Sequence, residues 1–397
     1  MTEAYIVAYG RSPICKGKEE GTYYYSKPEE IAAQVLRGVL ATLGESFPTH
    51  AIEDVIVGCS VPENLQGMNI ARKISLLAGL DVCVPGQTIN RFCASGLQSI
   101  ATAAAFIQSQ QADLLIAGGL EFASTTPATS PEMTNSLLLE SSPNPYSPWM
   151  GITAENVAEK YSISSEEQNR FALTSHEKAH LAQVSGKFEE EIIPVVVQRP
   201  KRIGSDIVLE DHVIDKDEGI RTDSSIEKLE HLPKIFKKEG TVTAATSSQI
   251  SDGAAFVVLA SPAAVKRYQL KPLARFLGCH TTGCEPALMG LGPITAIPKV
   301  LEKTGLKQKD IDLIELNEAF AAQALACIKA LNLADDKVNV NGGAIALGHP
   351  NGATGTVLTI KALSELKRRR ERYGLISMCV GGGMGAAGII ENLGAST

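Results

Sequence analysis

Cys93 lies in the stretch TINRFCASGLQSIATAAAF, where small residues follow it and an alanine-rich run predicts a long helix. A cysteine at a helix start meets the positive end of the helix dipole and free backbone N–H groups, which favour the thiolate. The thiolate is the nucleophilic form of cysteine, so Cys93 is predicted to be a nucleophile. Most cysteines are inert packing residues. This interpretation is given to Cys15, Cys59, Cys83, Cys279, Cys284 and Cys327.

A base that could activate this thiol occurs in the stretch GHPNGATG. Among the seven histidines of the chain, His349 is the one placed in this Gly-rich turn. An imidazole within reach of Cys93 would accept the thiol proton, as in other base-activated nucleophiles.

Two further turns carry groups that could stabilise developing charge. The stretch SMCVGGGMG places Cys379 at a strand end, before glycines whose backbone N–H groups, that of Gly381 included, can approach an oxyanion closely. In ELNEAFA, Asn317 ends a strand and could hold a water or a thioester oxygen. Gly-rich turns usually serve packing, and an asparagine at a helix start is usually a cap. Together, however, these residues predict acyl-transfer chemistry.

The elements around these turns indicate an α/β fold. Short apolar runs rich in β-branched residues alternate with helical patterns. Ser26 is expected to precede one helix, and Ser164 with Glu167 forms a predicted capping box for another. The expected strands cover 4–9, 54–59, 113–119, 255–260, 312–317 and 374–380.

The order of elements in 40–121 is repeated in 301–385. The repeat is too long for a stacked solenoid and indicates a duplicated domain. A duplication would bring the turns of Cys93 and His349 together between the two halves. Pro/Ser/Thr-rich and charged segments interrupt the pattern, as binding loops do. We therefore expect an N-terminal half at 1–120 plus 241–270, an inserted loop domain at 121–240, and a C-terminal half at 271–397.

Composition excludes several functions. The 397 residues carry a net charge of −7, which argues against a nucleic-acid partner, and no apolar stretch is long enough for a membrane span. No secretory leader is recognised, and the eight cysteines lack metal-ligand spacing. We expect free thiols, no metal and a cytoplasmic protein. The basic run 367–372 is interpreted as a solvated helix end.

The stretches NRFCASG, NEAFA, NVNGGAIALGHPNGATG and MCVGGGMGAAG resemble, in order and spacing, the signature blocks of the thiolases. The resemblance covers essentially the whole chain. It implies a thiolase-like fold of two αβαβα halves, the first carrying an inserted loop domain. Cys93 would carry the acyl group as a thioester, His349 would activate it, and Cys379 would move a proton. One oxyanion hole would use His349 and a water held by Asn317. The other would use the backbone N–H groups of Cys93 and Gly381.

The resemblance also implies contacts to coenzyme A. Coenzyme A and acyl-CoA would be substrates, and no permanently bound cofactor is expected. Ser248 would meet the pantetheine arm, Arg221 the adenine end, and Met150 the acyl chain. Ala245 and Thr246 stand where the family more often has Gly-Asn. Trp149 stands where acetoacetyl-specific members tend to have histidine, which favours a degradative enzyme.

Three functions are therefore weighed. The first is cleavage of 3-oxoacyl-CoA in fatty acid β-oxidation, and the second is Claisen condensation by an acetyl-CoA C-acetyltransferase. The third is a non-catalytic acyl-CoA or lipid-binding protein, which would have no need for Cys93, His349 and Cys379 together. A homodimer or homotetramer is expected, with a β-oxidation dehydrogenase as a possible partner.

Overall fold

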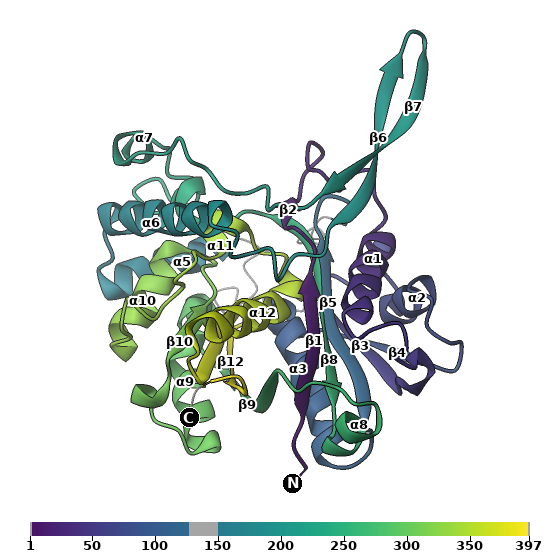
Figure 1. Cartoon of the computed structure of the whole chain (residues 1–397). Helices are drawn as coiled ribbons and strands as arrows, with labels where there is room; N and C mark the ends of the chain where they lie inside the picture. The colour runs from purple at the N-terminus through teal and green to yellow at the C-terminus, as the bar shows by residue number, and fades with distance from the viewer. Residues whose placement is uncertain (1, 127–149, 396–397) are drawn as a thin grey trace, which may run out of the picture.

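The computed structural model describes residues 2–126 and 150–395, and a ten-stranded sheet runs through it (Figure 1). Strand β2 (Cys15–Lys16) pairs with β8 beside the main path of this sheet. The other strands, in spatial order, are β10 (Leu313–Leu316), β11 (Tyr373–Val380), β12 (Met384–Asn392), β9 (Ala274–Gly283), β1 (Tyr5–Arg11), β8 (Ser251–Ala260), β5 (Leu114–Phe122), β3 (Asp54–Cys59) and β4 (Gly86–Ile89).

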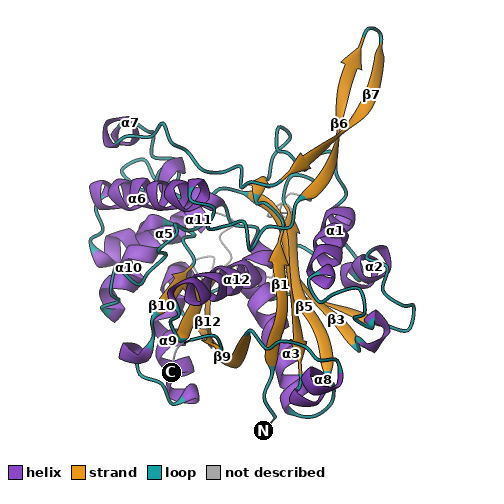
Figure 2. Ribbon diagram, viewed as in Figure 1, coloured by secondary structure: helices purple, strands orange, loops and turns teal. Residues whose placement is uncertain are grey.

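The α-helices flank and separate these strands (Figure 2). They are α1 (Pro28–Ala41), α2 (Ile70–Leu77), α3 (Ser95–Gln108), α5 (Met150–Tyr161), α6 (Ser165–Val184), α7 (Ile226–Glu230), α8 (Pro262–Arg267), α9 (Gly292–Thr304), α10 (Ala321–Leu331), α11 (Ala344–Leu347) and α12 (Asn351–Arg369).

The pairing pattern repeats in the two parts of the chain, as a duplication requires. In the first part β3 is parallel to β5, β5 is antiparallel to β8, and β8 is antiparallel to β1. In the second part β10 is parallel to β11, β11 is antiparallel to β12, and β12 is antiparallel to β9. The pairing of β1 with β9 joins the two parts into one sheet. The predicted α/β fold and its duplicated halves are confirmed, while the exact domain boundaries remain a prediction.

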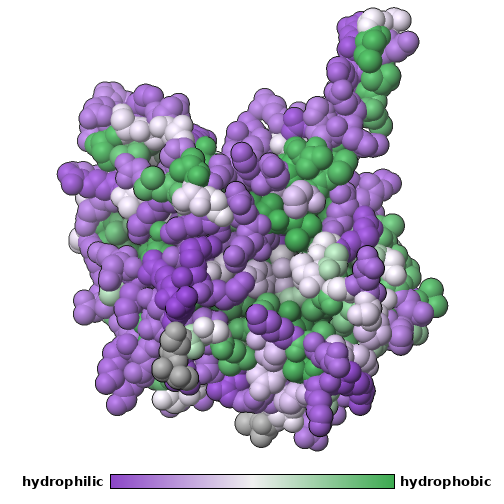
Figure 3. All heavy atoms as spheres, viewed as in Figure 1, coloured by the Kyte–Doolittle hydropathy of each residue, from purple (hydrophilic) through white to green (hydrophobic). Residues whose placement is uncertain are grey.

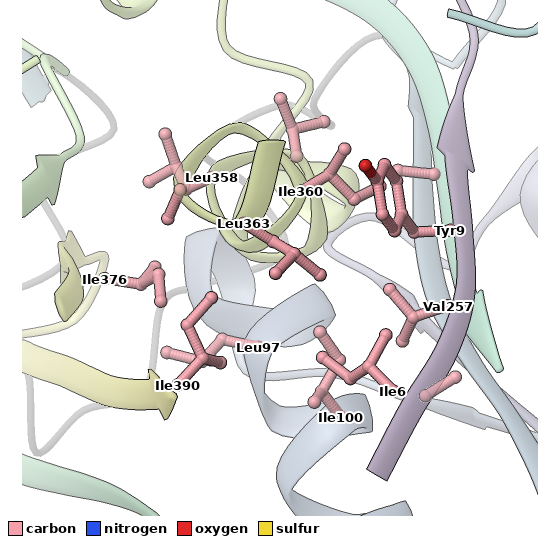
Figure 4. Packing of buried hydrophobic residues seen from close by; sticks show 14 of the residues in the cluster. Ile6, Tyr9, Leu97, Ile100, Val257, Leu358, Ile360, Leu363, Ile376 and Ile390 are labelled. Carbon is pink, nitrogen blue, oxygen red and sulfur yellow. The ribbon is translucent and has the colours of Figure 1, made fainter. Parts of the chain in front are cut away.

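Helices α3 and α12 fill the centre of the molecule. Every residue of α12 from Gly352 to Leu366 is buried. Figure 4 shows Leu97 of α3 and Leu363 of α12 in the same cluster as strand residues such as Ile6 and Ile376. Truncation of a buried leucine of this kind to alanine costs about 2–5 kcal/mol. The two helices that begin at the predicted active site are therefore also central to stability.

The starts of these two helices cross in direct contact. A Cβ atom placed on Gly355 would lie 2.2 Å from the backbone nitrogen of Leu97. The Thr356 hydroxyl donates a hydrogen bond to the carbonyl of Gly96 at 3.2 Å. The small residues that follow Cys93 and His349 therefore let the two helix starts approach each other.

The six strands expected from the sequence are present, and Ser164 forms the predicted capping box of α6 with Glu167. Ser26 is not the cap of α1. Lys27 occupies that position, because Pro28 provides the first helical residue and needs no backbone donor there.

The segment interpreted as a charged tract is a β-hairpin, β6 (Val195–Ile203) and β7 (Asp206–Ile214), that projects from the body (Figures 1 and 2). Apolar side chains on it, among them Ile207 and Leu209, are exposed. Figure 3 shows a green strip along the projecting hairpin. No helix within the described residues has the length and apolar content needed to cross a membrane.

Candidate active site

Cys93 lies in a short 3-10 turn, Phe92–Ala94, directly before α3. Phe92 has a φ of 44°, a left-handed conformation that costs energy in a residue other than glycine. Hydrogen bonds hold this turn, because the Phe92 N–H donates to the side chain of Asn90 and the Ser95 hydroxyl donates to the Phe92 carbonyl. The sequence placed Cys93 at a helix start, and the structure places it in a strained turn just ahead of the helix.

Although the Cys93 residue is partly exposed, loss of solvation at its sulfur raises the pKa of the thiol to about 11, while the backbone N–H groups of Gly381 and of Cys93 itself act in the opposite direction. The expectation that the helix start favours a resting thiolate is therefore wrong, because loss of solvation outweighs the helix dipole. The resting thiol is protonated at neutral pH and needs a base. The two N–H groups are the pair predicted to form an oxyanion hole, and they face the sulfur.

His349 lies between α11 and α12. Its backbone N–H donates to the Gln249 carbonyl and to the Ser251 hydroxyl, each at 3.1 Å. The preceding Gly348 has a φ of 109°, and a Cβ there would lie 2.2 Å from the Ser251 hydroxyl oxygen. Burial lowers the pKa of His349 to about 4, so the imidazole is neutral and able to accept a proton.

Asn317 is brought against the base. Its amide nitrogen Nδ2 lies 3.3 Å from Nε2 of His349, and its backbone N–H donates to the Ser377 carbonyl within β11. The amide oxygen Oδ1 is buried and has no hydrogen-bond partner within the described residues. Buried polar atoms are nearly always paired, so this oxygen is suited to a bound water. The water-holding role of Asn317 stays a prediction.

Cys379 is buried near the end of β11 and packs with Ala319, Phe320 and Met289. Burial raises the pKa of its thiol well above the usual value, and a negative charge on Cys93 raises it further. Charge on Cys327 and Cys284 acts on Cys379 in the same direction, and the proton-transfer role of Cys379 stays a prediction. Met150, the first residue of α5, packs on the edge of the same cluster.

Two buried carboxylates near the site escaped the sequence analysis. Glu121, at the end of β5, accepts hydrogen bonds from the backbone N–H groups of Ser60 and Gly352, each at 2.9 Å. It therefore links the end of β3 to the start of α12, just beyond His349. The feature of the sequence that could have indicated Glu121 is an acidic residue at the end of an apolar strand.

Glu318 is the second of these carboxylates and follows Asn317 directly. It accepts hydrogen bonds from the Ser175 hydroxyl at 2.6 Å, the Asn339 amide at 2.8 Å and the Ile345 N–H at 3.2 Å. These contacts tie α6 and α11 to the turn that carries Asn317. They hold the segment before His349 in place.

A pocket of about 170 Å³ lies beside this site, lined in part by Arg221, Lys228, Ser247 and Gln249. Arg221 and Lys228 line it together with the acidic Asp223, and the two cationic groups are suited to phosphate. Ser248 lies between two lining residues, and its backbone N–H donates to the Ala319 carbonyl at 2.9 Å. The pocket wall is thereby joined to the turn after Asn317.

Two sequence interpretations concern the surroundings of this pocket. Ala245, where the family more often has glycine, lines the pocket, and Thr246 is buried behind it. Trp149 lies outside the described residues. Within those residues no cluster of three or more His, Cys, Asp and Glu side chains is arranged to hold a metal ion.

Comparison with known proteins identifies the family. The family model described as "Thiolase, N-terminal domain" matches residues 4–263, and that described as "Thiolase, C-terminal domain" matches 270–392. A 3-ketoacyl-CoA thiolase of Bacillus subtilis is 45% identical over 393 residues, which cover 98% of this chain and 100% of the relative. An acetyl-CoA acetyltransferase of Chromobacterium violaceum is 43% identical over 401 residues, covering 98% and 99%.

A solved structure agrees with these sequence relatives. The crystal structure of human mitochondrial 3-ketoacyl-CoA thiolase superimposes with a TM-score of 0.88 at 35% identity, covering 99% of each chain. Both family domains match in order, and the relatives are matched over nearly their full length. The chain therefore belongs to the thiolase family, and it is an acyltransferase of the thiolase class.

Proposed function

We propose that this thiolase cleaves 3-oxoacyl-CoA with coenzyme A, giving acetyl-CoA and a shortened acyl-CoA, through an acyl-thioester on Cys93. The observation that carries the proposal is the convergence of five groups from distant parts of the chain. Gly381 offers its N–H to Cys93, Asn317 contacts His349, and Cys379 responds to charge on Cys93. Coenzyme A and its esters are substrates, and the chemistry proposed uses no permanent cofactor.

The first step forms the acyl-enzyme. His349 takes the thiol proton through Nε2, and the Cys93 sulfur attacks the 3-oxo carbon of the substrate. The backbone N–H groups of Cys93 and Gly381 stabilise the oxyanion. The bond between carbons 2 and 3 then breaks, leaving the acyl group on Cys93 and the enolate of acetyl-CoA. His349 and a water on Asn317 stabilise this enolate while it takes a proton from Cys379.

The second step transfers the acyl group to coenzyme A. The Cys379 thiolate left by the first step takes the proton of the coenzyme A thiol, and the coenzyme A sulfur attacks the thioester carbonyl. The same pair of N–H groups stabilises the oxyanion. Cys93 then leaves as a thiolate and receives its proton back from His349. Cys93, His349 and Cys379 thereby return to their starting protonation states.

The alternative direction, condensation of two acetyl-CoA molecules to acetoacetyl-CoA, uses the same residues. We favour cleavage of longer substrates because Met150, Phe236, Met289 and Phe320 belong to the apolar cluster around Cys379, which we propose as one wall of the acyl-chain site. An apolar wall suits an alkyl chain and discriminates weakly between lengths, by about 1–3 kcal/mol per methylene. The relatives carry both kinds of name, 3-ketoacyl-CoA thiolase and acetyl-CoA acetyltransferase.

A chain-length series tests this proposal. Measurement of kcat/KM for thiolysis of 3-oxoacyl-CoA esters from about four to sixteen carbons should show medium or long chains cleaved at least as well as acetoacetyl-CoA, with a graded preference. A steady fall of kcat/KM from four carbons upward would instead support the acetyl-CoA C-acetyltransferase. Absence of thiolysis with every ester would contradict both.

The proposal extends to assembly and context. Strand β4 ends the sheet with one edge unpaired within the described residues, which is a place where a second copy can add strands. We include a homodimer or homotetramer, a β-oxidation dehydrogenase as partner, and a cytoplasmic location in the proposal. Arg199, Lys201 and Arg202 on β6, with the lysines of 234–240, are candidates for contact with the 3′-phosphate of coenzyme A.

A further inference from the structure

The side chain of His349 is held at both ring nitrogens, and only one of its two partners belongs to the reaction described above. Nε2 faces the amide nitrogen of Asn317 at 3.3 Å. Nδ1 lies 2.6 Å from the hydroxyl oxygen of Thr354, which is buried in the first turns of α12. The Thr354 hydroxyl is also 3.0 Å from the carbonyl oxygen of Pro350, four residues back.

The chemistry of these partners assigns a direction to each bond. An amide NH₂ only donates, so Nε2 of His349 must present its lone pair to Asn317. A neutral imidazole has one N–H, which then lies on Nδ1 and points at Thr354. The Thr354 hydroxyl accepts that bond and gives its own proton to the Pro350 carbonyl, a bond that threonine commonly makes inside helices. The chain is consistent from end to end, with no donor facing a donor.

We propose that Thr354 is a positioning residue that holds His349 in the tautomer with the proton on Nδ1, so that the Nε2 lone pair, which accepts from Asn317 in the resting enzyme, is the one that takes the Cys93 proton. This inference rests on the proposed role of His349 as the base. The nitrogen that must accept the proton is fixed by the hydrogen bond of the other nitrogen, as is general for catalytic histidines. Thr354 does not touch substrate and acts only through His349.

A neutral hydroxyl differs from a carboxylate in this position. A carboxylate would stabilise the imidazolium ion, whereas Thr354 leaves the imidazole a weak base. The start of α12 adds to this effect, since the positive end of a helix dipole disfavours a nearby cation. His349 therefore returns its proton readily when Cys93 leaves in the second step. Burial, which lowers the pKa of His349, works in the same direction.

Two substitutions separate positioning from packing. Thr354→Val keeps the shape of the side chain and removes the hydroxyl, whereas Thr354→Ser keeps the hydroxyl and removes a methyl group. We expect Thr354→Val to lose about tenfold in kcat with KM little changed, as for a lost neutral hydrogen bond. Thr354→Ser should retain most of kcat, whereas a role in packing alone would make the serine variant the worse of the two.

The tautomer itself is read by nitrogen NMR of the enzyme labelled with ¹⁵N-histidine, where a protonated and an unprotonated ring nitrogen give well-separated signals. The His349 signals are assigned as those that disappear in His349→Gln. We expect the wild-type and Thr354→Ser enzymes to carry the proton on Nδ1. Thr354→Val should shift it partly to Nε2, with the Asn317 amide turned so that its oxygen accepts from Nε2.

A proton on Nε2 in the resting wild-type enzyme would overturn the inference, whether or not either variant folds. An unchanged tautomer and kcat in a folded Thr354→Val would overturn it as well. The NMR measurement needs no substrate, so it is independent of the proposed function. Absence of thiolysis by the wild-type enzyme would contradict the proposed function and leave the tautomer result to be judged on its own.

Discussion

The turns before α3 and before α12 occupy matching places in the duplicated fold, yet they hold their side chains in different ways. Cys93 lies in a strained turn and is partly exposed, with backbone N–H groups facing its sulfur. His349 is buried, and side-chain groups contact both of its ring nitrogens. The nucleophile is thus accessible to substrate, whereas the base is buried and held in a fixed orientation.

This difference explains why a duplication is useful here. Each half supplies a helix start and a strand end, and the crossing of α3 and α12 brings both turns to one place. After duplication, one turn could specialise in covalent chemistry and the other in proton transfer. Glu121 connects them, since it bonds to the end of β3 in the first half and to the start of α12 in the second.

The largest effect is expected from removal of either active-site thiol, because we predict separate tasks for Cys93 and Cys379. Cys93→Ala should abolish acyl transfer and give no acyl adduct, because the nucleophile is lost. Cys379→Ser should still form the adduct on Cys93 but turn it over more slowly, by about a hundredfold or more, because proton transfer is lost. Mass spectrometry of each variant after addition of 3-oxoacyl-CoA measures the adduct. An unacylated Cys93 in Cys379→Ser would show that the roles are misassigned.

The crossing of the two helices gives the next largest effect, on stability. Gly355→Ala places a methyl group against the backbone of Leu97, so we expect a loss of about 1–3 kcal/mol in the free energy of unfolding despite the better helix propensity of alanine. The matched control is Gly278→Ala on β9, where the added Cβ would meet a methyl group of Thr304 at an ordinary 3.4 Å. Chemical denaturation of both variants measures the difference. Equal stability of the two would mean that the helix starts are not tightly packed.

Much of this arrangement could be predicted from the sequence, because it depends on local patterns. Alternating β-rich runs and helical segments located strands such as β3 and β11, and Gly-rich turns marked His349 and Cys379. The order of elements that occurs in 40–121 and again in 301–385 predicted the duplication. In each case the signal lies within a few neighbouring residues or in the order of elements.

The features that could not be predicted depend on contacts between distant residues. Glu121 becomes a link only because Ser60 and Gly352 meet it in the fold. The β6–β7 hairpin was hidden because charged residues break the alternating pattern on its exposed strands. The pKa of Cys93 had the wrong predicted direction, because the helix dipole can be inferred from the sequence and the loss of solvation cannot.

The last prediction concerns the protonation state of the Cys93 thiol in the free enzyme. Because burial raises the pKa of this thiol to about 11, alkylation of the free enzyme by iodoacetamide should rise about tenfold per pH unit from neutral pH upward. Acyl-CoA should protect Cys93 but not Cys83, an exposed thiol that serves as the internal control. Peptide mapping gives the rate at each cysteine.

A rate at Cys93 that is already constant at neutral pH would indicate a resting thiolate paired with protonated His349. In that case the backbone N–H groups and the imidazole would outweigh burial, and proton transfer would precede substrate binding. The predicted rise of the alkylation rate with pH instead means that proton transfer follows substrate binding, when His349 takes the proton as the sulfur attacks.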